Sequence, residues 1–138
     1  MHRTGSRAAG IILASVCAGP VFVISVCLAT LYGMLPRPMA VSAETMGLFA
    51  ALLAASLPFG GVIAILPNLF GTLVMAALAE SEEWARTPCV WMLAGAVIGL
   101  GIALPLGTGD PDRFFAFGFV ITSAISARLC RTFLRWTD

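Results

Sequence analysis

The chain has 138 residues, of which 59% are hydrophobic and 11% are charged, and its formal net charge is +1. A soluble domain carries about 25% charged residues, so this composition excludes a water-facing surface and predicts an integral membrane protein. The near-neutral charge also excludes a nucleic-acid partner, because such a partner requires a dense basic patch on the protein.

The first apolar segment carries no charge over residues 8–36, which is enough for a membrane crossing with some tilt. We interpret residues 9–35 as a retained transmembrane helix. A cleaved signal peptide is not favoured, because its apolar region spans only about 7–15 residues. Pro36 and Pro38 end the helix, since proline cannot continue the helical hydrogen-bond ladder.

The second apolar segment, residues 46–79, is interrupted between Pro58 and Asn68 by a second proline, Pro67. About 20 apolar residues cross a bilayer core of roughly 30 Å, so the segment is too long for one straight crossing and too short for two. Two arrangements fit. Residues 46–57 form a half-inserted helix before a bend, or one long helix is tilted and kinked at a proline. Both arrangements contain a single crossing.

Residues 88–106 and 113–134 give the third and fourth predicted helices. Pro88 suits the first turn of a helix, where its missing N–H group is not needed. The uncharged run of the fourth helix, residues 114–127, is short for a crossing, and the helix reaches the required length only if it includes Arg128 with its long side chain extended toward the interface. The sequence therefore predicts one all-α domain, residues 1–138, with four transmembrane helices.

The arginines predict how this domain is oriented. Four crossings place six arginines on one side and two on the other, and positively charged loops remain in the cytoplasm. Both termini are therefore expected in the cytoplasm of a multi-pass protein of the bacterial inner membrane. Trp91 is expected in the aromatic belt on the same side. The six cytoplasmic arginines are Arg3, Arg7, Arg86, Arg128, Arg131 and Arg135, and the other two are Arg37 and Arg113.

Small residues on the third helix form the first candidate site. Gly95, Gly99 and Ala103 are spaced four residues apart and therefore share one helix face. Small residues allow membrane helices to approach closely. We expect this face to pack against another helix, and we favour packing within the chain over a dimer interface.

Pro67, Asn68 and Gly71 form the second candidate site, a polar break within the second helix. An asparagine in hydrocarbon must find hydrogen-bond partners. In a functional interpretation the break lines a permeation path, as in transporters with discontinuous helices. In the favoured structural interpretation the amide bonds a freed carbonyl or a neighbouring helix.

The third candidate site is a contact with anionic lipid headgroups, made by arginines at helical spacing: Arg128, Arg131 and Arg135. We expect no catalytic, cofactor or metal site. The four cysteines lack paired spacing, and the single histidine is His2.

Two functions are compatible with these features. The leading hypothesis is a non-enzymatic interaction or accessory subunit that packs through small-residue helix faces, either against itself or against a larger membrane protein. The alternative is a small oligomeric channel or transporter in which the break at Pro67 and Asn68 lines the path.

Overall fold

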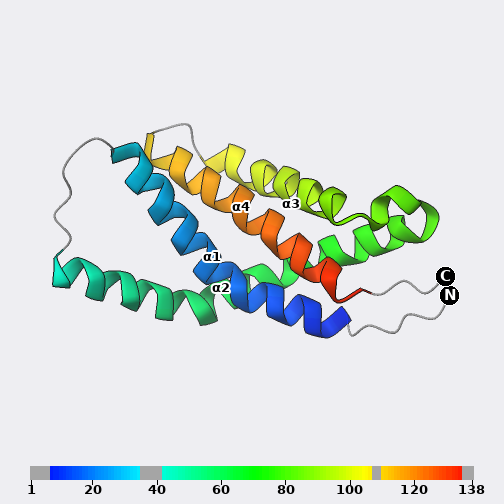
Figure 1. The fold of residues 1–138 in the computed structure, drawn as a ribbon, viewed down its shortest axis with the longest axis horizontal. Helices are drawn as coiled ribbons and strands as arrows, with labels where there is room; N and C mark the ends of the chain where they lie inside the picture. The colour runs from blue at the N-terminus through cyan, green and yellow to red at the C-terminus, as the bar shows by residue number, and fades with distance from the viewer. Residues whose placement is uncertain (1–6, 35–41, 107–109, 135–138) are drawn as a thin grey trace.

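The computed structural model describes residues 7–34, 42–106 and 110–134, which form four α-helices and two short 3₁₀ turns (Figure 1). The helices are α1 (Arg7–Met34), α2 (Ala43–Ser81), α3 (Pro88–Ala103) and α4 (Asp110–Thr132). The turns η1 (Glu83–Arg86) and η2 (Leu104–Leu106) flank α3. The described residues contain no strand, and the prediction of an all-helical fold is confirmed for them.

Three of the described helices are long and apolar enough to cross a membrane, over Ala8–Gly33, Ala43–Ser81 and Arg113–Thr132. The predicted extension of the fourth helix through Arg128 is confirmed, since α4 continues to Thr132, and α3 is the shortest of the four described α-helices, with 16 residues. The regular helix of α3 ends before Pro105, because this proline has no N–H group to donate back along the helix, and the chain tightens into η2.

The helices form a curved layer in which α1 and α4 lie side by side at the centre (Figure 1). α2 packs on the outer side of α1, and α3 packs on the outer side of α4. The start of α1 adjoins the end of α4, where the Cys130 thiol lies 3.8 Å from the carbonyl oxygen of Gly10. The described chain therefore begins and ends at the same end of the bundle.

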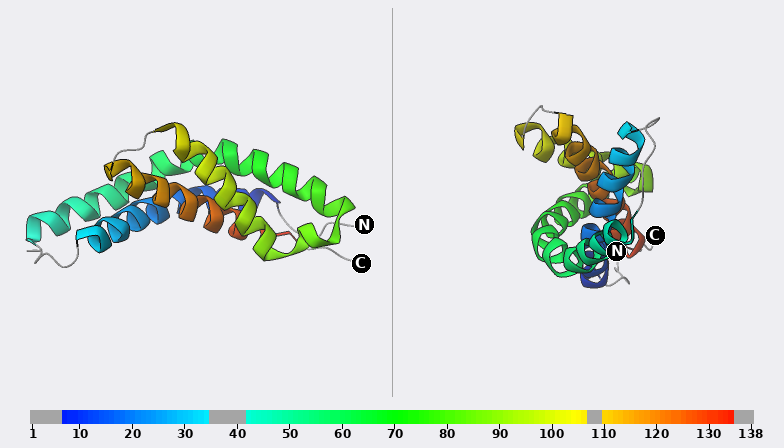
Figure 2. Two further views of the ribbon diagram at one scale, coloured as in Figure 1. Left: turned by 90° about the horizontal axis from the view of Figure 1, so that it is seen from above. Right: turned by 90° about the vertical axis from the view of Figure 1, so that its left-hand side faces the viewer.

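α2 is one continuous helix of 39 residues, although it contains Pro58 and Pro67. The long helix is thus the observed arrangement of the two that the sequence allows. Its axis bends near the middle (Figure 2), as expected where prolines remove backbone hydrogen bonds. Ser42 caps the first turn, since its hydroxyl oxygen accepts a hydrogen bond from the Thr45 N–H at 3.1 Å.

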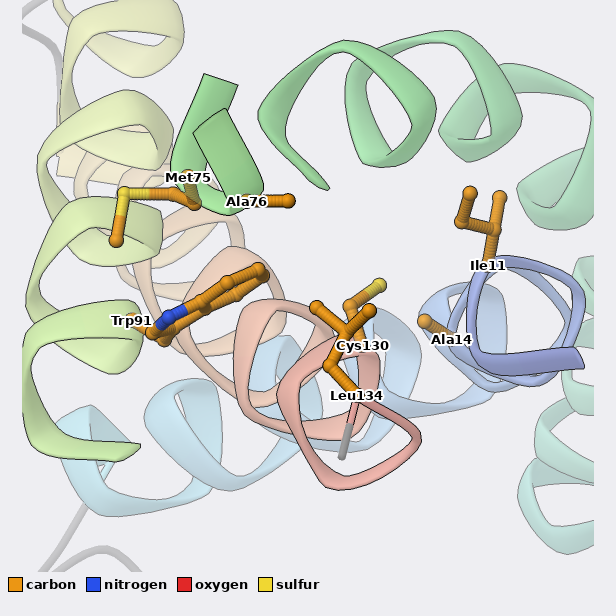
Figure 3. Packing of buried hydrophobic residues seen from close by; sticks show 7 residues of the cluster. All are labelled: Ile11, Ala14, Met75, Ala76, Trp91, Cys130 and Leu134. Carbon is orange, nitrogen blue, oxygen red and sulfur yellow. The ribbon is translucent and has the colours of Figure 1, made fainter. Parts of the chain in front are cut away.

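The main buried cluster lies at the end of the bundle that holds the two described chain ends, and all four helices contribute to it (Figure 3). Trp91 is its largest member and is only 1% exposed. Its indole N–H donates to the carbonyl oxygen of Ala85 in η1 at 2.8 Å. This bond satisfies the polar edge of the ring inside the protein, so the expectation that Trp91 lies in the interfacial belt is wrong. The cluster consists of Ile11, Ala14, Met75, Ala76, Trp91, Cys130 and Leu134.

The crossing of α1 and α2 is set by two glycines, Gly19 and Gly60. A Cβ atom added to Gly19 would collide with the carbonyl oxygen of Ser56, and one added to Gly60 would collide with the Cα atom of Gly19. Only residues without a side chain permit backbones to approach this closely. Neither glycine belongs to a site predicted from the sequence.

Candidate functional site

A groove of about 420 Å³ runs between α2 and α3, and residues of α1 and α4 form its floor. It exists because α2 and α3 lie on opposite flanks of the central helix pair and come together mainly at the end that holds Met75 and Trp91 (Figure 3). Its volume is within the range of about 300–1,000 Å³ that is typical of ligand sites. The lining is mostly apolar and includes no charged side chain.

All three residues of the predicted polar break, Pro67, Asn68 and Gly71, line this groove. The side-chain amide of Asn68 donates to the hydroxyl oxygen of Ser15 in α1 at 3.1 Å. Ser15 is only 3% exposed, so this hydrogen bond connects α1 and α2 in apolar surroundings. Hydrogen bonds between membrane helices are worth about 0.6 kcal/mol on average and up to about 1.7 kcal/mol.

Ser15 was not identified from the sequence, although a signal for it exists. It lies between Ala14 and Ala18 on the buried face of α1. A buried hydroxyl on such a face requires a hydrogen-bond partner, from a neighbouring helix or from a carbonyl oxygen of its own helix. The sequence does not show that this partner is Asn68, because 53 residues separate the two.

Gly71 differs from the glycines that fix helix crossings. A Cβ atom added to Gly71 would meet nothing within 4 Å, whereas Gly60, in the same helix, is in contact with the backbone of α1. The missing side chain of Gly71 therefore leaves open space along the groove and does not serve packing among the described residues.

The α4 side of the floor carries several small polar side chains. Thr122, Ser123, Ser126 and Cys130 all line the groove, at a spacing that keeps them on neighbouring faces of one helix. The hydroxyl oxygen of Thr122 is buried and has no hydrogen-bond partner in the described part of the chain. The groove thus combines apolar walls with a narrow polar strip along its floor.

The predicted small-residue face of α3 points toward α4. A Cβ atom on Gly95 would collide with the carbonyl oxygen of Ser123, and one on Gly99 would lie 2.6 Å from the carbonyl oxygen of Phe119. Ala103, the third member, is 3% exposed. This face is therefore occupied within the chain by α4.

The three predicted headgroup-binding arginines have different environments. Arg128 is exposed, and its Nη1 atom lies 3.4 Å from the sulfur of Met92. Arg131 is directed inward, where Nε donates to the carbonyl oxygen of Arg86 and Nη1 donates to that of Leu134, both at 2.7 Å. Arg131 therefore connects η1 to the end of α4. Arg135 lies outside the described residues.

Among the described residues, no group of three or more His, Cys, Asp or Glu side chains is arranged to hold a metal ion. The four cysteines are all free thiols. Comparison with family models, curated proteins and solved structures finds no match. The groove therefore has to be interpreted from its own geometry, which suits an apolar occupant with few hydrogen-bonding groups.

Proposed function

We propose that this chain is a small polytopic membrane protein that acts as a non-enzymatic interaction or accessory subunit, with the groove between α2 and α3 as its binding surface. The supporting observation is that these two helices stay apart along most of the groove. Gly19 of α1 and the glycines Gly95 and Gly99 of α3 are already in contact with neighbouring helices of the same chain. The partner is therefore expected at the groove instead of at the small-residue face of α3.

A transmembrane helix of another polypeptide is the occupant that fits this surface. The groove has no charged lining, so it does not favour a charged ligand, and it follows the direction of the neighbouring helices. Apolar side chains of a helix lying alongside would fill it, and the small polar groups on the floor would accept hydrogen bonds between helices. The partner is then a second copy or a larger membrane protein.

Four crossings are part of this proposal. At 1.5 Å per residue, α3 measures about 24 Å, and the three residues of η2 add about 6 Å. Together they reach the roughly 30 Å of a bilayer core. The described chain begins and ends at one end of the bundle, as an even number of crossings requires. With the arginine distribution, this supports cytoplasmic termini in a bacterial inner membrane.

A photo-crosslinking amino acid in α3 tests the binding surface. Ile98 lines the groove, whereas its neighbour Val97 does not and is 62% exposed. In native membranes we expect a protein adduct from position 98 and only lipid adducts from position 97. Lipid adducts alone from both positions, or equal protein adducts from both, would contradict the proposal.

A channel or transporter is the second candidate, because Pro67, Asn68 and Gly71 line the groove together with hydroxyl groups of α4. Its test compares Asn68→Leu with Ser15→Ala. Both remove the same hydrogen bond, but only the first changes a side chain that lines the groove. A channel predicts that Asn68→Leu abolishes flux into liposomes while Ser15→Ala retains it. If neither variant changes flux while both lower stability, the amide is structural.

A further inference from the structure

We infer that the floor of the groove is a binding site for an uncharged, lipid-soluble carbonyl compound, the chemical class to which membrane quinones belong. Hydroxyl groups of α4 donate hydrogen bonds to the carbonyl oxygen, and the apolar walls enclose the rest of the molecule. The inference goes beyond the proposed function, since it concerns the floor of the groove and is tested without a partner helix.

Two hydroxyl groups on the floor lack the partners that buried hydroxyls need. The hydroxyl oxygen of Thr122 is buried and has no hydrogen-bond partner in the described part of the chain. Ser126, one turn further along α4, is 4% exposed and lines the groove. Its hydroxyl also forms no hydrogen bond with any described residue. A molecule in the groove that pairs with these donors removes the cost of leaving them unsatisfied.

A hydroxyl in a helix can be satisfied by its own helix, and other hydroxyls of this chain are satisfied in this way. Those of Thr30, Ser81 and Thr132 donate to a carbonyl oxygen three or four residues earlier in the chain, at 2.7–3.0 Å. Thr122 and Ser126 make no such bond within the described residues. Their hydroxyls therefore remain free to pair with a molecule in the groove.

The chemistry of the groove favours a carbonyl compound over the charged and the purely apolar parts of lipids. The lining has no charged side chain, so it offers nothing to hold a phosphate or a carboxylate. An acyl chain has no acceptor for the hydroxyl protons, whereas a carbonyl oxygen accepts two hydrogen bonds and adds no donor that would need a partner of its own. Asn68 supplies a further donor from the α2 wall, because only one of its two amide protons is used by Ser15.

The depth of the site separates it from the ester groups of phospholipids. Thr122 lies near the middle of the apolar span Arg113–Thr132, about 14 Å from either end. In a bilayer with a hydrocarbon core of roughly 30 Å, that position is close to the centre. A phospholipid ester would have to leave the interface to reach it, whereas an uncharged lipid-soluble compound already resides in the hydrocarbon.

Aromatic rings from three helices line the groove together with these hydroxyls. They are Phe22 of α1, Trp91 of α3 and Phe119 of α4, and the ring centroids of Phe22 and Phe119 are 4.9 Å apart. A flat ring that carries carbonyl groups can pack against such side chains by stacking or edge contacts. Trp91 also provides a reporter, because quinones quench tryptophan fluorescence on close approach.

Fluorescence quenching of Trp91 tests the site in the purified chain reconstituted in phosphatidylcholine vesicles. The other two tryptophans, Trp84 and Trp136, are replaced by phenylalanine, and menadione, a naphthoquinone without a lipid tail, is titrated. We expect quenching that saturates. Methylnaphthalene, which has the ring without the carbonyl groups, should not relieve it, and equal competition by methylnaphthalene would overturn the inference.

Substitutions that remove single hydroxyls test which groups bind the carbonyl oxygen. Ser126→Ala and Thr122→Val should each weaken menadione binding about 2- to 10-fold, the loss expected for one hydrogen bond. Ser25→Ala and Thr30→Val are the matched controls, since both residues belong to α1 and neither lines the groove, and they should leave the affinity unchanged. Quenching that rises linearly with menadione and is the same in all four variants would indicate random collision and overturn the inference.

Vesicles of ether-linked phosphatidylcholine, which has no ester carbonyl groups, identify the source of the ligand. Equal saturation in ether-linked and ester-linked vesicles is expected for a compound separate from the phospholipids. Saturation confined to the ether-linked vesicles would mean that phospholipid esters hold the site, and it would overturn the assignment to a separate compound.

The two proposals fail independently. If menadione does not saturate while position 98 still crosslinks to a protein, the inference is overturned and the proposed function stands. If menadione saturates while position 98 yields lipid adducts alone, the proposed function is overturned and the inference stands.

Discussion

The contact between α3 and α4 can be tested by comparing two glycines of one helix. Gly99 faces α4, where an added Cβ atom would lie 2.6 Å from the carbonyl oxygen of Phe119 and 2.9 Å from the hydroxyl oxygen of Ser123. Gly101, two residues further along α3, would place the same atom in open space. Each of the substitutions Gly99→Ala and Gly101→Ala adds one methyl group. The methyl group at position 99 would contact α4, and the one at position 101 would have no neighbour.

The structure predicts that the two substitutions change the free energy of unfolding in opposite directions. Alanine is more favourable than glycine inside a helix by about 0.5–1 kcal/mol, and this gain applies to both positions. Overpacking costs about 1–3 kcal/mol and applies only at Gly99, because the nearest atom there is a backbone oxygen of the packed helix α4. We expect Gly101→Ala to raise the free energy of unfolding slightly. The free energy of unfolding of Gly99→Ala should be lower than that of Gly101→Ala by about 1–3 kcal/mol, since the gain in helix propensity is the same for both and cancels in the comparison.

The free energy of unfolding can be measured by titrating the purified protein in mild detergent with a denaturing detergent and following helicity by circular dichroism. The comparison is between the midpoints of the two variants and that of the unchanged chain. If the two alanine variants unfold at the same midpoint, α3 does not approach α4 along the face of Gly99, and the packing described above is wrong.

Three further predictions concern the rest of the bundle. Trp91→Phe removes the donor to the Ala85 carbonyl oxygen and should lower the free energy of unfolding by about 1–3 kcal/mol, measured by the same titration. Gly19→Ala forces a methyl group against the Ser56 carbonyl, so it should separate α1 from α2 and give aggregated protein on size-exclusion chromatography, whereas a monodisperse, stable variant would contradict this crossing. Arg131→Met removes two hydrogen bonds to backbone carbonyls and should accelerate hydrogen exchange in η1 and the last turn of α4, with unchanged rates as the contradicting result.

Much of the fold could be predicted from apolar length and from helix-ending residues. Pro88 marks the start of α3 correctly. α2 begins at Ala43, three residues before the predicted start at 46, because Ser42 is the residue that caps the helix. The continuity of α2 through Pro58 and Pro67 does not follow from the sequence, since the local sequence does not decide whether a proline bends a helix or ends it.

The contacts that build the candidate site could be predicted only in part. The need of Asn68 for a partner follows from its chemistry, but the identity of Ser15 depends on how α1 crosses α2. Trp91 was assigned to the interface because its partner, a carbonyl oxygen in η1, is created only by the fold. Arg131 likewise looked like a surface cation, and its two acceptors are main-chain atoms that no side-chain pattern reveals.

The length of α2 would make a membrane-embedded form of this protein sensitive to the thickness of the bilayer. Thirty-nine residues extend about 58 Å, nearly twice a bilayer core of roughly 30 Å, so in a bilayer this helix would have to tilt, bend or extend beyond the apolar core. A thicker bilayer lets a long helix stand more upright, and a thinner one increases its tilt. Because α2 forms one wall of the groove, a change in its tilt would widen or narrow that opening. Lipid chain length would thus act on partner binding without contacting the partner.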